Sequence, residues 1–197
     1  MYEINNDVTN NIIINKSNFI CCLFKVYDED SIRQILENIR LKYKDATHYC
    51  YAYIIGEKRK SSDDGEPGGT AGIPMLDVLI KNKITNILCV VVRYFGGIKL
   101  GAGGLVRAYS KSVKSALECV NLLILIPSYI LEIKFCYEKI KLIDNILKDS
   151  LIIEKKFDEI ITYKINIVQN CDFINKLNSL CLSCNKLNSS FITKRPE

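Results

Sequence analysis

Two glycine-rich segments hold the residue types that could bind an oxygen-rich ligand. Residues 61–74 read SSDDGEPGGTAGIP and carry three carboxylates, whereas residues 94–109 read YFGGIKLGAGGLVRAY and contain five of the ten glycines. Clustered carboxylates can hold a magnesium ion or act as acid and base. Glycines allow a ligand to approach backbone N–H groups closely. The first segment is therefore a candidate cleft and the second a candidate anion site.

The second segment joins an expected strand to an expected helix. The strand ends at residues 93–95, the glycines turn the chain, and the helix begins near residues 102–105. The first N–H groups of a helix have no partner inside it and carry a partial positive charge, which suits phosphate. The candidate anion-binding residues are Arg93, Gly96, Gly97, Lys99, Gly101, Gly103, Gly104 and Arg107.

This anion site has an equally weighted alternative. The spacing of the glycines matches neither a Walker loop nor the G-x-G-x-x-G pattern of dinucleotide-binding proteins. A tight turn from strand to helix, followed by a solvated basic helix face, would explain the same residues. Residues Arg107, Lys111 and Lys114 form that basic face.

The acidic segment and the only histidine define a possible cleft made of His48, Asp63, Asp64 and Glu66. The alternative, favoured on composition alone, is a solvated acidic turn that pairs with Arg93 or with the basic residues 58–60. Cys181 and Cys184 form a single C-x-x-C with no second pair, and helical spacing on an apolar face explains them. We expect no metal and no cofactor, and the role of this cysteine pair stays open.

Composition sets the class of protein. The chain has 197 residues, of which 48% are hydrophobic and 25% charged, and its net charge of +5 permits an anionic partner. Nine cysteines, an odd number without framework spacing, indicate a reduced and therefore cytoplasmic protein. No apolar run reaches the ~18 residues needed to span a bilayer, and the first residues do not resemble a secretory signal. We expect no membrane partner.

Hydrophobic periodicity predicts two α+β domains. The first, residues 1–125, has expected strands at 17–27, 47–55 and 86–95, helices at 28–44 and 72–82, and a long helix after the second glycine segment. Residues 56–70 are expected to form a loop. The second domain, residues 128–197, reads as strand, helix, strand, strand, helix and strand, the ferredoxin-like β-α-β-β-α-β order. The two are expected to join near residues 125–128.

Three ordered motifs resemble the IMPACT/YigZ family. They are HYCYAY at 48–53, SSDDGEPGGTAGIP at 61–74 and VVVRYFGGIKLGAGGLVRAY at 90–109, and the resemblance covers about residues 15–125. The later half is similar to the small C-terminal domain of bacterial YigZ-type members. Gly68 and Val92 depart from the serine and threonine more usual in the family. Their absence weakens any hypothesis in which those two hydroxyls donate to a ligand.

The resemblance implies a fold and a functional context. It implies an N-terminal domain similar to the ribosomal-protein fold of elongation factor G domain IV, and a ferredoxin-like domain similar to domain V of that factor. Eukaryotic relatives are linked to translational control through protein partners. Since a fold alone does not assign chemistry, these remain expectations.

Three functional hypotheses follow. The favoured one is a non-enzymatic, translation-linked regulator or RNA- and phosphate-binding module, with RNA, the ribosome or a translation-associated protein as partner. An alternative is a hydrolase or transferase acting on a phosphorylated or peptidic substrate at the acidic and glycine-rich cleft. A third is a protein-interaction module in which the glycine segments only build the fold. No nucleophile with an evident base partner supports the enzyme.

Overall fold

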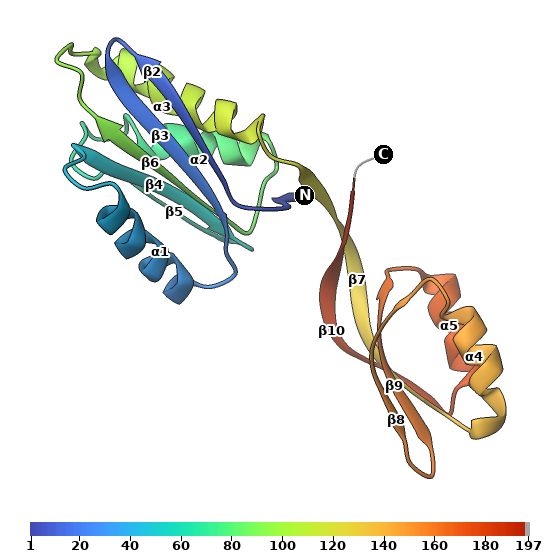
Figure 1. Cartoon of the computed structure of the whole chain (residues 1–197). Coiled ribbons are helices and arrows are strands. Elements are labelled where there is room, and N and C mark those ends of the chain that lie inside the picture. The colour runs from blue at the N-terminus through green and yellow to red at the C-terminus, as the bar shows by residue number, and fades with distance from the viewer. Residues whose placement is uncertain (196–197) are drawn as a thin grey trace. The chain divides into compact units, whose positions relative to one another are not determined.

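The computed structural model describes residues 1–195 and confirms an α+β protein (Figure 1). The chain divides into two compact units, the first comprising residues 1–124 and the second residues 125–194. The first unit holds two buried hydrophobic clusters and the second unit holds one. No helix among the described residues is long and apolar enough to cross a membrane.

The first unit is built on a five-stranded antiparallel sheet with the order β2-β3-β6-β4-β5. The central strand β6 is buried along seven of its eight residues, as its continuous apolar sequence predicts. The alternating side chains of the sheet enter two separate hydrophobic clusters, one on each face. The strands are β2 (Val8–Ile14), β3 (Ser17–Lys25), β4 (His48–Ile55), β5 (Lys58–Ser62) and β6 (Ile87–Tyr94).

Three helices cover the two faces of this sheet. Helix α1 (Glu29–Lys42) lies on one face and begins at Asp28, whose carboxylate accepts a 2.7 Å hydrogen bond from the Ser31 N–H. Helices α2 (Gly72–Lys81) and α3 (Gly101–Leu117) cover the other face, as Figure 1 shows. The sheet and the last two helices therefore place both glycine-rich segments in the same unit.

Three strands of the first unit were not predicted from the sequence. Two are β1 (Tyr2–Ile4) and β2, and the third is β5, which lies where a loop was expected. The sequence of β5, KRKSS, has no apolar alternation because this strand forms the exposed edge of the sheet. Its conformation comes from pairing with β4, so no local pattern indicates it.

The second unit contains the predicted alternation of elements. In chain order these are β7 (Leu122–Phe135), the short 3-10 helix η1 (Tyr137–Lys139), α4 (Ile140–Ile146), β8 (Leu151–Phe157), β9 (Ile161–Val168), α5 (Cys171–Leu180) and β10 (Ser183–Lys194). Strand β9 pairs antiparallel with both β7 and β8, and β10 pairs with β7. The apolar residues of β7 and β9 pack with α4 and α5 in one cluster.

Residues 125–128, where the two domains are expected to join, lie within β7. The first residues of this strand pair with β1, with Ile124 opposite Tyr2, and its later residues pair with β9 from Ser128 onward. Pro127 lies between the two ladders, where the lack of a backbone N–H costs no hydrogen bond to β1 or β9. The apolar run that suggested a domain border is therefore a strand.

Candidate anion-binding pocket

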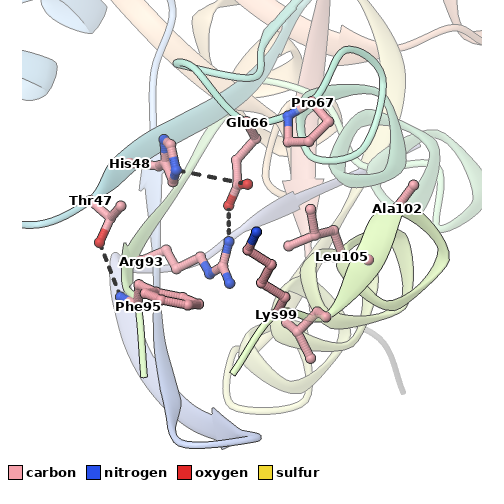
Figure 2. A pocket seen from close by; sticks show the side chains of 11 residues that line it. Thr47, His48, Glu66, Pro67, Arg93, Phe95, Lys99, Ala102 and Leu105 are labelled. Carbon is pink, nitrogen blue, oxygen red and sulfur yellow. Dashed lines mark hydrogen bonds and ion pairs between the residues drawn. The ribbon is translucent and has the colours of Figure 1, made fainter. Parts of the chain in front are cut away.

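A pocket of about 320 Å³ lies between the two glycine-rich segments (Figure 2). It is bounded by the start of β4, the segment before α2, the end of β6 and the start of α3. Most of the wall is apolar, with a few charged groups among it. The residues that line it are Thr47, His48, Glu66, Pro67, Arg93, Phe95, Lys99, Leu100, Gly101, Ala102 and Leu105.

A buried ion pair joins the two segments. The Arg93 Nη1 lies 2.5 Å from the Glu66 Oε1, and the side chains are only 6% and 3% exposed. The Tyr109 hydroxyl donates a 2.8 Å hydrogen bond to the same oxygen. Such a buried pair needs added hydrogen bonds to offset its desolvation, and Tyr109 supplies one. Arg93 is thus a partner of Glu66, which removes its charge from the set predicted to bind an anion.

The His48 ring has one nitrogen bound and one open. Its Nδ1 lies 2.9 Å from the Asp64 carbonyl oxygen, and since a carbonyl only accepts, Nδ1 carries the hydrogen. Its Nε2 lies 3.8 Å from the Glu66 Oε2, beyond hydrogen-bond distance. In the neutral ring Nε2 is therefore an acceptor, and it lies beside a carboxylate in the wall of the pocket (Figure 2).

Asp63 stabilises the start of α2 and does not line the pocket. Its carboxylate accepts hydrogen bonds of 2.8, 3.0 and 2.8 Å from the N–H groups of Gly69, Ala71 and Gly72. Burial alone raises the pKa of Asp63, but these three donors outweigh it and hold the pKa below its usual value. Asp63 therefore organises the segment, contrary to the expectation of a cleft residue.

Asp64 is also occupied by structural contacts. One oxygen lies 2.7 Å from the Arg40 Nη2, and the other accepts a 2.7 Å hydrogen bond from the Tyr49 N–H. With both oxygens bonded, Asp64 joins the acidic segment to α1 and β4. Among the described residues no three His, Cys, Asp or Glu side chains are grouped to hold a metal ion.

The glycines of the second segment have different roles. A Cβ at Gly96 would overlap the backbone of Lys16, so this glycine permits a close approach between two chain segments. Gly101, at the first position of α3, has a φ of +67°, and Gly97 has a φ of +83°. Gly103 and Gly104 lie in the first turn of α3 and have no positive φ. The positive φ angles of this segment are thus adopted by Gly97 and Gly101, and Gly103 and Gly104 are not needed for them.

The start of α3 opens onto the pocket without a side-chain cap. Leu100 occupies the capping position, and its apolar side chain cannot cap the helix. Gly101 and Ala102 line the pocket. The Lys99 side chain extends along the pocket wall (Figure 2). The Arg107 Nη1 would lie 3.6 Å from a Cβ on Gly103, so this guanidinium lies over the first turn. Two cations and free N–H groups are thereby gathered at one place.

Several residues of the pocket and its support were not identified from the sequence. Phe95, Pro67 and Leu105 form apolar wall, and nothing in their spacing distinguishes them from core or loop residues. Tyr109 belongs to the apolar stripe of α3, a pattern that indicates a core residue and gives no sign of its bond to Glu66. Burial, then Cys50 and Glu66, raise the pKa of Tyr109 far above its usual value, so it stays a hydrogen-bond donor.

Cys50 lies behind the pocket and donates a 2.9 Å hydrogen bond to the Asp63 carbonyl oxygen. Burial raises the pKa of its thiol to about 12. Because the thiolate is the reactive form of cysteine, Cys50 is a structural side chain at neutral pH.

Two sequence comparisons agree on the class of protein. The protein-family model described as Impact N-terminal domain matches residues 15–117. The IMPACT family member YvyE of Bacillus subtilis is 44% identical over 148 residues, which cover 74% of this chain and 68% of YvyE. The chain described here belongs to the IMPACT family.

Other relatives match between about half and nine tenths of the chain. The IMPACT family member YigZ of Escherichia coli is 44% identical over 110 residues, or 53% of this chain and 54% of YigZ. A solved structure described as that of a hypothetical protein is 32% identical, with a TM-score of 0.64 over 90% of this chain and 91% of that one. The family signature therefore coincides with the unit that holds the pocket.

Proposed function

We propose that this IMPACT family protein is a non-enzymatic, translation-linked RNA-binding module whose pocket takes a phosphate group at the start of α3. The observation that carries the proposal is the uncapped first turn of α3, which opens onto the pocket beside Lys99 and has the Arg107 guanidinium over Gly103. Free backbone N–H groups at a helix start attract anions, and phosphate is the anion that RNA presents.

The charge balance of the pocket favours an anion. Glu66 is the one carboxylate in the wall, and the buried Arg93 neutralises it. Lys99 and Arg107 have no acidic partner among the described residues. The net charge of +5 adds a weak general attraction for a polyanion.

The folds of the two units support a setting in translation. The second unit has the order β-α-β-β-α-β with β9 between β7 and β8 and with β10 beside β7, and we propose that it is ferredoxin-like. With a first unit of the elongation factor G domain IV type, the protein would meet RNA, the ribosome or a translation-associated protein in the cytoplasm.

A hydrolase or transferase acting on a phosphorylated or peptidic substrate is the second candidate function. The observation in its favour is the open His48 Nε2 beside Glu66, a pair able to move a proton. Against it, Asp63 and Asp64 are both occupied by structural contacts. Turnover of such a substrate that disappears in His48→Ala would favour this candidate over a binding module.

The test is the salt dependence of RNA binding, measured by fluorescence anisotropy with a labelled single-stranded RNA. The double variant K99A/R107A should weaken binding for all sequences alike and reduce the slope of log K against log salt by about 1.4. The matched control K58A/R59A removes one lysine and one arginine from the exposed edge strand β5. An unchanged slope in the pocket variant, with a reduced slope in the control, would place the binding surface on β5.

A further inference from the structure

Two hydrogen-bond acceptors in the pocket lack donors. The Glu66 Oε2 and the His48 Nε2 lie 3.8 Å apart, and neither has a hydrogen-bond partner among residues 1–195. The Glu66 side chain is only 3% exposed and Glu66 lines the pocket, so its Oε2 is available to a ligand there. A carboxylate oxygen that no protein donor bonds is a strong acceptor, so a ligand that donates to it would gain a charge-assisted hydrogen bond.

The charges around the two acceptors limit which kind of ligand can donate to them. A ligand that satisfies both acceptors needs two N–H groups on one edge. An ammonium or guanidinium group would supply them, but the Arg93 guanidinium already neutralises Glu66 and Lys99 adds a further positive charge. A ligand that carries two uncharged N–H donors and a separate negative charge fits these residues better. Nucleobases linked to phosphate have that character.

The apolar wall suits a flat ring. Phe95 is 45% exposed, and it lines the pocket together with Pro67 and Leu105. The volume of about 320 Å³ lies at the lower end of the range for small-molecule sites, which is roughly 300 to 1,000 Å³. Aromatic side chains are the usual platform on which proteins stack an unpaired RNA base. The pocket therefore has room for one base and a surface to hold it.

We propose that the pocket holds an unpaired guanine of single-stranded RNA, with its N1–H donating to the Glu66 Oε2 and its 2-amino group donating to the His48 Nε2. This inference rests on the proposed function, which supplies the phosphate site at the start of α3. Guanine presents two donors side by side on its Watson–Crick edge. Adenine presents a ring acceptor at N1, and uracil has no amino group.

The experiment compares three labelled RNAs that are identical except for one unpaired nucleotide: guanosine, inosine or adenosine. Inosine keeps the N1–H and lacks the 2-amino group. Guanosine should bind tightest and adenosine weakest, with about 5- to 150-fold between them, the range for a good bidentate base contact. Since these changes lie in the ligand, they leave the folding of the protein untouched.

A protein variant tests whether the preference for guanosine over inosine depends on His48. His48→Phe keeps a ring of similar size and loses the Nε2 acceptor, so it should abolish the difference between guanosine and inosine while RNA still binds in a salt-dependent way. Thermal melting confirms that the variant is folded. Equal affinity of the unmodified protein for all three RNAs, with salt dependence retained, overturns the guanine proposal alone. Absence of RNA binding at low salt overturns the proposed function as well.

Discussion

Arg93 at the end of β6 and Glu66 in the segment before α2 form an ion pair buried between the two glycine-rich segments. The Arg93 guanidinium also lies over the rings of Phe19 and Phe95, at 5.3 and 5.6 Å from their centroids. This pair fixes the carboxylate that faces the pocket. The wall is thus rigid before any ligand arrives, which lowers the entropic cost of binding.

Replacing Arg93 with methionine should destabilise the protein by about 3–5 kcal/mol, because it leaves the Glu66 carboxylate buried without its partner. Chemical denaturation followed by circular dichroism measures this free energy of unfolding. The control is Lys58→Met, since Lys58 forms an exposed pair with Glu29 and such pairs contribute about 0–1 kcal/mol. The double variant R93M/E66Q should recover part of the loss. If Arg93→Met and Lys58→Met lowered the free energy of unfolding equally, the buried pair would contribute no more to stability than the exposed one.

The stability of the first unit should fall on acidification as Asp63 is protonated. Its folded-state pKa lies below its usual value, so the stabilisation by its carboxylate is complete above the usual pKa of aspartate and is lost as the pH falls through the folded pKa. Asp63→Asn keeps one acceptor oxygen and loses the other, so it should cost about 0.5–1.5 kcal/mol at pH 7, as for one lost hydrogen bond. Thermal melts between pH 7 and pH 2 should show a smaller acid loss in Asp63→Asn. A parallel decline in both proteins would contradict this.

Gly103→Ala should give a folded protein that binds RNA more weakly. A Cβ at Gly103 meets only the Arg107 Nη1, at an ordinary 3.6 Å, and alanine favours helix over glycine by roughly 0.5–1 kcal/mol. The added methyl group would crowd the free N–H groups of α3. Paired thermal melts and RNA titrations test this, with Gly68→Ala as control because its Cβ meets nothing within 4 Å. If the folded Gly103→Ala variant bound RNA as tightly as the unmodified protein, the first turn of α3 would not be part of the binding site.

Cys50 should resist alkylation in the native protein. With a pKa of about 12 it has almost no thiolate at pH 8, and it is fully buried. Cys119, Cys136 and Cys171 are exposed and should react first with iodoacetamide. Peptide mass spectrometry before and after denaturation measures these sites. Rapid modification of Cys50 in the folded protein would mean that the pocket opens far more often than its buried contacts suggest.

The elements with strong local signals could be predicted from the sequence. Strand β6 has a continuous apolar run, and α1 and α3 have clear apolar stripes. By contrast, β5 depends on pairing with β4, and β1 depends on partners at residues 122–124. Those contacts join segments distant in sequence, so local patterns do not encode them.

The candidate site was predictable to a similar degree. The opposite charges of the two segments indicated that they would lie together, and Glu66 and Arg93 do so. The roles of the neighbouring residues were not indicated. Asp63 is bonded to N–H groups that only the turn brings together, and Gly96 is required by the backbone of Lys16. Both depend on tertiary geometry rather than on residue type.

The pairing of β1 with β7 affects where the first unit can be cut. The family match ends at residue 117, but β1 takes its partner from residues 122–124. A fragment ending at residue 117 would keep the bonds of Tyr2 to Lys83 and Thr85, yet leave the opposite side of β1 without a partner strand. Such an open edge invites pairing between molecules. The compact unit that ends at residue 124 is therefore longer than the stretch of sequence by which the family is identified.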